Sequence, residues 1–221
     1  MTYLPIALSV KRGAFRADQP HPPASDELYR QARVKALRRD EFTCRFCGFK
    51  HEKNEIHHAN DNHDDHSDDN LITSCVLCHM CHHIGFAATQ NRGKLIYLPG
   101  SQIDQAGLNQ LVRMLWIAEH MSTGDLKNTA SSLLSRLDRA DIPAATLLGT
   151  SSPSILADFM ASLPEDEYQN RGLVLQDIYL LPNKQAYLPY LKLWIEGSKS
   201  YKPADWVETA RQKFADWRDS V

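Results

Sequence analysis

The 221-residue sequence predicts a mainly α-helical protein of the α+β class. Two observations support this prediction. All five cysteines lie between Cys44 and Cys81, in a region of short segments that suit strands and turns. The second half of the chain instead places apolar residues at helical spacing, for example Leu108, Leu111 and Leu115. We therefore expect a small core of strands and one helix, with further helices packed against it.

The composition is that of an ordinary globular protein, with 43% hydrophobic and 24% charged residues. No stretch approaches 18 consecutive apolar residues, so we expect no direct membrane span. Five cysteines, an odd number with paired spacing, suit a metal in a reducing compartment better than a disulfide framework. These features predict a cytoplasmic protein.

The net charge of −2 hides an asymmetry along the chain. Residues 1–50 carry ten Lys or Arg and five Asp or Glu, whereas residues 51–70 carry one Lys and seven acids. Proteins built mainly to hold nucleic acid usually present a dominant basic face. The charge pattern therefore gives little support to nucleic-acid binding.

Local signals predict three N-terminal segments. Residues 1–24 contain four prolines and little periodicity, which predicts an extended arm. Ser25 precedes two acids and predicts a helix that runs to about Asp40. Residues 42–49 contain two cysteines two residues apart, followed by Gly48, which can turn with positive φ. That pattern predicts a zinc knuckle.

The next segments are expected to form a strand, a loop, a second strand or turn, and a helix. Residues 53–59 suit a strand, and residues 60–69 are polar, acidic and rich in turn residues. A short strand or turn from Asn70 leads to a helix that begins near Val76 and carries two histidines four residues apart.

The rest of the chain is predicted to be helical apart from one strand. Residues 94–98 predict a strand that Pro99-Gly100 ends. Ile142-Pro143 and Leu180-Leu181-Pro182 are expected to interrupt the helical pattern. Helices are expected from a cap at Asp104 to 121, and over 126–139, 153–161, 184–196 and 203–219, with a further segment from Pro164.

These elements group into three predicted parts: an arm (1–24), a zinc-containing domain (25–100) and a helical region packed on it (101–221). Aromatic residues concentrate in the last 40 residues. They serve either as the core of a small helical subdomain or as anchors for an amphipathic partner helix. They are Tyr187, Tyr190, Trp194, Tyr201, Trp206, Phe214 and Trp217.

Cys44, Cys47, Cys75 and Cys78 form two CxxC pairs. Two residues between cysteines let both sulfurs reach one ion from a single tight turn, and two such turns complete a tetrahedral site with no open position. We therefore predict a structural Zn²⁺ bound by these four cysteines. The alternative, buried free cysteines, does not account for two pairs with this spacing. Cys81 is left over, as a small core residue or as a substitute for one ligand.

The histidines form a second pattern. His57-His58 lies in a predicted strand, Asn70 follows the acidic loop, and His79 and His83 come next. Together with the CxxC pairs, this order resembles the HNH (ββα-metal) nuclease motif, which implies an HNH-like ββα core. The resemblance also implies that His57, His79 and His83 hold one divalent ion. His58 would then be the general base that activates water, and Asn70 would pin the loop.

Two interpretations of this region stay open. The resemblance, which covers residues 41–84, implies a second site that holds Mg²⁺, Mn²⁺, Ni²⁺ or Zn²⁺ and hydrolyses DNA. Alternatively, the segment is a degenerate HNH scaffold with a structural role. The loop between His58 and Asn70 carries five aspartates, which would repel a phosphate backbone unless an ion neutralised them.

A second resemblance extends over nearly the whole chain. Its segments are Leu4 to Gly13, Phe42 to Phe49, Leu95 to Pro99, Asp177 to Pro182, and Trp194. They are similar to the IcmJ/DotN family of the Dot/Icm type IVB secretion system, whose members join the cytoplasmic coupling complex at the inner membrane. The resemblance implies a zinc-containing HNH-like fold with helical additions. It also implies binding to a C-terminal segment of the coupling ATPase and to other coupling-complex subunits.

Two functions are therefore predicted. The first is a non-catalytic adaptor or structural subunit of the coupling complex, cytoplasmic and held at the inner membrane only through its partners. The second is a metal-dependent HNH endonuclease that acts on DNA. The HNH histidines can be lost in the IcmJ/DotN family, whereas this sequence retains all of them, which keeps the second function open.

Overall fold

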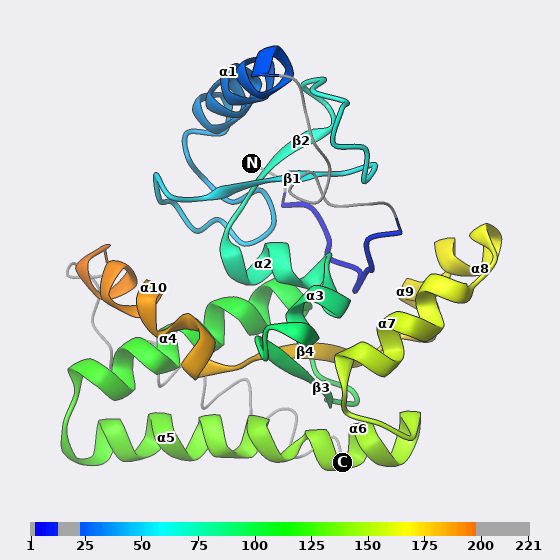
Figure 1. Ribbon diagram of the computed structural model, residues 1–221. Coiled ribbons are helices and arrows are strands. Elements are labelled where there is room, and N and C mark those ends of the chain that lie inside the picture. The colour runs from blue at the N-terminus through cyan, green and yellow to red at the C-terminus, as the bar shows by residue number, and fades with distance from the viewer. Residues whose placement is uncertain (1–2, 13–22, 198–221) are drawn as a thin grey trace.

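The computed structural model describes residues 3–12 and 23–197, which form a mostly helical α+β fold with two small sheets (Figure 1). The helices are α1 Pro23–Arg39, α2 Val76–Cys81, α3 Ile84–Thr89, α4 Gln105–Met121, α5 Gly124–Arg139, α6 Asp141–Leu148, α7 Pro153–Ser162, α8 Glu165–Gln169, α9 Arg171–Val174 and α10 Lys184–Gly197. The strands are β1 Glu55–His58, β2 Leu71–Ser74, β3 Gly93–Tyr97 and β4 Ile178–Pro182.

An upper layer combines α1 with the hairpin of β1 and β2 (Figure 1). The two strands pair antiparallel, with His58 opposite Leu71. Ala36 and Leu37 of α1 pack against Ile56 and Leu71 in a small core of their own. The strand predicted before the acidic loop and the helix predicted before the knuckle are both confirmed.

Asp40 joins the end of α1 to the hairpin. Its buried carboxylate accepts two hydrogen bonds from the Arg39 guanidinium (2.9 and 2.7 Å) and one from the Thr73 backbone (3.3 Å). Arg45 lies 3.3 Å from the same carboxylate. Burial alone would raise the pKa of Asp40, but the hydrogen bonds from Arg39 and Thr73 hold that pKa below its ordinary value.

A lower layer contains the antiparallel pair of β3 and β4, with α4, α5 and α10 around it (Figure 1). The strand predicted at 94–98 is confirmed as β3. The expected interruption of the helical pattern at Leu180-Leu181-Pro182 is confirmed, and it takes the form of a buried strand, β4, which the sequence did not predict. Pro182 ends the strand, where a missing N–H group is tolerated. The pairing joins residues on both sides of position 100, and the domain boundary there stays a prediction.

Helix α4 is the central element of the lower layer. It begins as predicted, with the Asp104 side chain accepting a hydrogen bond from the Gly107 backbone (2.7 Å). It packs against α5, α10, β4 and α2. The expected interruption at Ile142-Pro143 is wrong, because Pro143 lies in the first turn of α6, where proline costs no hydrogen bond.

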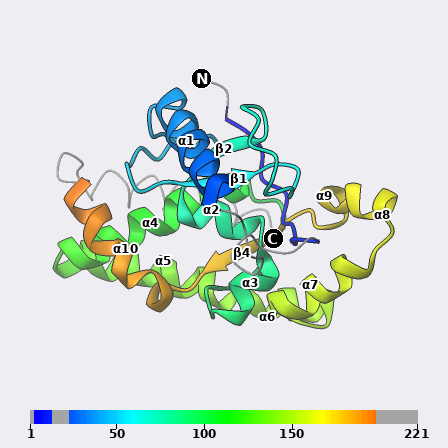
Figure 2. The ribbon, with the colours of Figure 1, turned by 45° about the horizontal axis from the view of Figure 1, so that its top comes forward.

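The remaining helices lie to one side. Helix α7 packs against α3, and α8 and α9 continue from it (Figure 2). Of the C-terminal aromatic residues, Tyr187 and Trp194 belong to the main hydrophobic core, where both stack near Trp116. The predicted helix over residues 203–219 lies outside the described residues. None of the helices in the described ranges is both long and apolar enough to cross a membrane.

Candidate metal centres

The first cysteine pair lies on a tight turn. The Gly48 backbone donates a hydrogen bond to the Cys44 carbonyl (2.9 Å), and the Cys44 backbone donates one to the Phe49 carbonyl (2.9 Å). Gly48 has a φ of 74°, in the left-handed region, and a Cβ atom there would lie 2.5 Å from the Tyr3 hydroxyl. The positive φ favours glycine at this position, whereas the Tyr3 side chain is exposed and its hydroxyl end can move.

The second pair lies at the start of α2, where Cys75 precedes the first helical residue and Cys78 follows within the helix. The sulfurs of Cys44, Cys47, Cys75 and Cys78 all lie within 4.8 Å of one another, and all four residues are buried. All five cysteines of the chain are outside disulfides. The structure thus brings the four predicted cysteines into one buried cluster that could hold a metal ion.

A row of buried polar side chains on α4 faces this cluster. Gln105, Asn109 and Arg113 are four residues apart, so they share one face of the helix. Gln105 hydrogen-bonds both backbone groups of Leu180 (2.8 and 3.0 Å) and the Asn109 side chain (3.0 Å). Asn109 donates to the sulfur of Cys78 (3.5 Å). The apolar pattern of α4 gives no sign of this row.

Arg113 ends the row with only 6% of its surface exposed. Its guanidinium nitrogens lie 3.7 Å from the Cys75 sulfur and 3.9 Å from the Cys47 sulfur. The group also lies 4.0 Å from the centre of the Phe49 ring. Within the described ranges, no carboxylate forms an ion pair with it.

A buried cation without a compensating charge is costly. Four thiolates around Zn²⁺ carry a net charge of about −2 and would supply the missing negative charge. The surroundings of the cysteines therefore fit thiolate ligands on a metal ion, and fit four neutral thiols poorly.

The pKa values of two thiols in this region are shifted in opposite directions. Hydrogen bonds from the other three cysteines of the cluster, together with the charge of Arg113, hold the pKa of Cys47 far below its ordinary value. Burial raises the pKa of Cys81 to about 12. The Cys81 thiol lies outside the four-sulfur group and donates a hydrogen bond to the Leu77 carbonyl (3.3 Å). Cys81 therefore occupies the place of a small, neutral core residue.

Three of the predicted histidines form a second group beside the first. Ligand atoms of His57, His79 and His83 lie within 4.8 Å of one another, and the Nε2 atoms of His79 and His83 are 3.2 Å apart. The expectation that His79 and His83 share one helix is wrong, because α2 ends at Cys81 and His83 precedes α3. The two rings converge across a helix break instead.

The N-terminal arm explains this break. Ser9 donates its backbone N–H to the Cys81 carbonyl (2.9 Å), and the Ile84 N–H donates to the Ser9 carbonyl (3.0 Å). A continuous helix would use both of these groups for its own hydrogen bonds. The backbone of Ser9 therefore takes up hydrogen-bonding groups that would otherwise join α2 and α3 into one helix.

Glu55 is a further residue of this group, which the HNH resemblance does not include. Its carboxylate oxygen lies 2.7 Å from Nδ1 of His79. Because a carboxylate only accepts hydrogen bonds, Nδ1 of His79 carries the hydrogen of this contact, and Nε2 is the ring atom that faces His83. Carboxylates orient metal-binding histidines in this way. Glu55 lies on β1 two residues before His57, and no sequence pattern marks it.

The buried histidines also fit a metal ion. Burial, and then the neighbouring histidines, lower the pKa of His57 far below its ordinary value and that of His83 to about 2. Neutral imidazole is the form that binds metals. Nδ1 of His57 is buried and finds no hydrogen-bond partner in the described part of the chain. Three protein ligands leave coordination positions open, unlike the four-cysteine cluster.

His82, which was not among the predicted ligands, packs against this group. Its ring centre lies 4.1 Å from that of His57 in a stacked arrangement and 4.8 Å from that of Phe46. Burial lowers the pKa of His82 to about 3. This neutral ring helps to hold His57 in place.

His58 lies next to the three histidines but outside their group. Its ring centre is 4.6 Å from that of His63, and its Nε2 is buried with no partner among the residues described. Burial, and then the charges of nearby groups beginning with His63, lower the pKa of His58 to about 4. The side chain is therefore neutral near pH 7, and burial makes it a weaker base than an exposed histidine.

Asn70 organises the loop between β1 and β2. Its side-chain oxygen accepts a hydrogen bond from the Asn60 backbone (2.9 Å), and its nitrogen donates to the carbonyls of Asp65 (2.8 Å) and Asn62 (3.4 Å). These contacts hold the loop that follows His58, while any part of Asn70 in catalysis stays a prediction.

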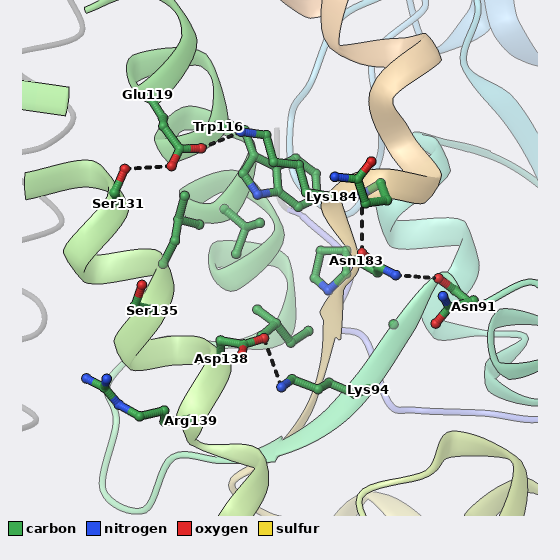
Figure 3. A pocket seen from close by; sticks show the side chains of 16 residues that line it. Asn91, Lys94, Trp116, Glu119, Ser131, Ser135, Asp138, Arg139, Asn183 and Lys184 are labelled. Carbon is green, nitrogen blue, oxygen red and sulfur yellow. Dashed lines mark hydrogen bonds and ion pairs between the residues drawn. The ribbon is translucent and has the colours of Figure 1, made fainter. Parts of the chain in front are cut away.

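A cavity of about 720 Å³ lies apart from both centres, between α4, α5 and the β3–β4 sheet (Figure 3). Four of its five charged residues are paired, Lys94 with Asp138 (2.8 Å) and Lys184 with Glu119, and Arg139 is the fifth. The cavity therefore offers no cluster of metal ligands or catalytic groups.

The fold and the two ligand groups define an α+β protein with a candidate metal-binding core. No protein-family model matches the chain. The chain is 28% identical over 174 residues to the type 4 apparatus protein DotN of Legionella pneumophila subsp. pneumophila strain Philadelphia 1. The match covers 76% of this chain and 80% of DotN. The chain is thus similar, over most of its length, to a protein described as part of a type 4 apparatus.

We predict that Cys44→Ser removes one zinc per chain and lowers the melting temperature sharply, because the binding free energy of a structural zinc is folding free energy. Cys81→Ser is the matched control and should keep its zinc with a stability loss of about 1–2 kcal/mol. Elemental analysis and thermal melting of both variants check this. Full zinc content in Cys44→Ser, or zinc loss in Cys81→Ser, would contradict the assignment of ligands.

We predict that Arg113→Met lowers zinc affinity roughly 10- to 100-fold, as changes beside metal ligands do. The metal-free protein should not lose stability, because neutral thiols leave the Arg113 cation uncompensated. Arg113→Lys keeps the positive charge, so its zinc affinity should lie between those of the native protein and Arg113→Met. Chelator competition measures the affinity, and urea unfolding with and without zinc measures the stability. Equal destabilisation of both forms would show that Arg113 acts through packing alone.

Proposed function

We propose that this protein is a zinc-containing adaptor or structural subunit of the coupling complex of a type IVB secretion system. In this proposal it binds a C-terminal segment of the coupling ATPase and contacts other subunits of that complex. It would work in the cytoplasm and reach the inner membrane only through these partners. The observation that carries the proposal is the similarity to DotN over 174 residues.

The length of this match favours an assembly role. A match of 174 residues extends well beyond the metal region of residues 41–84, so it includes much of the helical structure. A nuclease motif alone would need only the shorter segment. The arrangement of β1, β2 and α2 beside a four-cysteine cluster is what an HNH-like scaffold stabilised by Zn²⁺ would require.

We predict that the purified protein forms a complex with a peptide from the C-terminal segment of the coupling ATPase of its own secretion system. Cys44→Ser should lose that binding together with its zinc, whereas Cys81→Ser should retain it. Size-exclusion chromatography with light scattering and calorimetric titration give the stoichiometry and the affinity. A folded, zinc-loaded protein that binds no such segment would overturn the adaptor proposal.

The second candidate function is metal-dependent hydrolysis of DNA, and the histidine group is the observation that favours it. His57, His79 and His83 would hold a divalent ion, which when bound supplies a Lewis acid for the leaving oxygen. His58 would take a proton from water, and its pKa of about 4 would have to rise when the site is occupied for it to be an efficient base near pH 7. Asn70 would pin the adjoining loop so that His58 points at the phosphate.

The acidic loop should repel a phosphate group less strongly than its five aspartates indicate. Asp65 accepts hydrogen bonds from the Asn60 side chain (2.7 Å) and the Ser67 backbone (3.0 Å). Asp68 pairs with Lys35 of α1 (2.6 Å). Part of the negative charge of the loop is therefore neutralised or hydrogen-bonded within the protein.

The nuclease candidate predicts cleavage of supercoiled plasmid in the presence of Mg²⁺, Mn²⁺ or Ni²⁺. His58→Ala should reduce the rate about 10²- to 10⁴-fold, the usual contribution of a general base. His120→Ala is the matched control, because His120 lies exposed on α4 away from both centres. Gel electrophoresis of time courses measures the rates. If no ion supports cleavage, or if cleavage survives in His58→Ala, this candidate is rejected.

A further inference from the structure

Exposed apolar side chains gather on the helices α6, α7 and α9. Six of the eleven large apolar side chains that are exposed in the described part of the chain lie between positions 142 and 174. Single apolar residues on a surface are ordinary, whereas a gathering of them is typical of an interaction surface. The six are Ile142, Leu147, Ile155, Phe159, Leu173 and Val174.

Helix α7 is apolar on two of its faces. The inner face packs closely against α3, where a Cβ atom at Gly85 would lie 3.2 Å from that of Ala157, and Met160 is buried in the main core. On the outer face, Ile155 and Phe159 are one helical turn apart, with exposed fractions of 58% and 59%. The core needs only the inner face. The outer face is therefore an apolar stripe that no part of the described chain covers.

The same part of the chain is strongly acidic. Residues 141–177 carry six Asp or Glu and a single base, Arg171. The Arg171 guanidinium donates hydrogen bonds to the N-terminal arm. Asp158, Asp166 and Glu167 are exposed, and within the described ranges their carboxylates form no ion pair or hydrogen bond. Uncompensated negative charge therefore accompanies the exposed apolar side chains.

Contacts on the inner side hold these helices in place. Glu165 pairs with Arg12 (2.7 Å), and the Tyr168 hydroxyl exchanges hydrogen bonds with the Val10 backbone (3.0 and 3.1 Å). Helix α6 packs against β3. The helices follow one another along one side of the molecule (Figures 1 and 2). A partner would thus meet a surface that is already formed, which lowers the entropic cost of binding.

We propose that the segment from α6 to α9 is a docking surface for a basic amphipathic helix of a partner protein. The apolar side of that helix would cover Ile155 and Phe159. Its Lys and Arg residues would lie opposite Asp158, Asp166 and Glu167, which favours this orientation and speeds association. The same carboxylates disfavour a nucleic acid or an anionic membrane. The inference rests on the proposed assembly role only for the identity of the partner, a subunit of the coupling complex.

The test uses two labelled model peptides, whose binding to the zinc-loaded protein is followed by fluorescence anisotropy. One peptide has Leu on one helical face and Lys on the other, and the second has Glu in place of each Lys. We expect the Leu/Lys peptide to bind, more weakly as salt is added, and the Leu/Glu peptide not to bind. Equal binding of the two peptides, or binding of neither, would overturn the inference.

Phe159→Ser should weaken binding of the Leu/Lys peptide roughly 10- to 100-fold, as the loss of an aromatic contact at the centre of an interface does. Leu28→Ser is the matched control, because Leu28 is exposed to a similar extent (61%) but lies on α1. Both variants should keep their zinc and melting temperature, since each changes an exposed side chain. If the two variants bind the peptide equally well, the docking surface is rejected.

A pair of double variants tests the charge. Asp166→Asn combined with Glu167→Gln should weaken binding of the Leu/Lys peptide several-fold and reduce its salt dependence. Glu52→Gln combined with Asp125→Asn removes the same charge at exposed positions elsewhere, and should change binding less than about twofold. Equal losses in both double variants would show that net charge alone attracts the peptide, against the inference.

The proposed function is tested separately, with the peptide from the C-terminal segment of the coupling ATPase. If that peptide does not bind while the Leu/Lys peptide binds through Phe159, the adaptor proposal fails and the docking surface stands. If the ATPase peptide binds while the Leu/Lys peptide does not distinguish Phe159→Ser from Leu28→Ser, the docking surface fails and the adaptor proposal stands.

Discussion

The rest of the structure is organised around four buried sulfurs and the buried cation beside them. Arg113 lies 3.7 Å from one sulfur of the cluster and stacks on Phe49, and the described residues give it no carboxylate partner. A buried guanidinium in this position is favourable only if the sulfurs are thiolates, as they are when they bind a metal ion. Because Arg113 belongs to α4, the same interaction fastens the helical half of the protein to the cysteine core.

The two candidate centres share one short helix. Helix α2 has six residues, supplies Cys78 to the sulfur cluster and places His79 immediately after it. So short a helix is not stable by itself. Its position depends on the four-cysteine cluster on one side and on the backbone of Ser9 at its end. Loss of metal from the cysteines would therefore displace His79, and the histidine group would lose its geometry whether it catalyses a reaction or only supports the fold.

The sequence predicted the features that depend on residues close together in the chain, and missed those that depend on residues far apart in it. The cysteine pairs, the Gly48 turn and the cap at Asp104 depend on residues close in the chain, and local patterns predicted them. Strand β4 pairs with β3 across more than 80 residues, so no local signal distinguishes it from a break before a helix. Arg113 and Glu55 act through contacts made only in the folded chain. The end of α2 likewise depends on Ser9, 72 residues before Cys81.

The arm gives a physical reason why the helical half matters to the histidine centre. Tyr168 and Arg171 hold Ser9 and Val10, and Ser9 completes the hydrogen bonding at the break that brings His79 and His83 together. Displacement of α8 or α9 would loosen the arm and, with it, this break. A partner that binds the protein more tightly with α8 and α9 in place than with them displaced would therefore stabilise the histidine centre. A ligand at that centre would then change the affinity for the partner by the same factor that the partner changes the affinity for the ligand. An assembly role and a ligand-binding centre are in this way compatible in one chain.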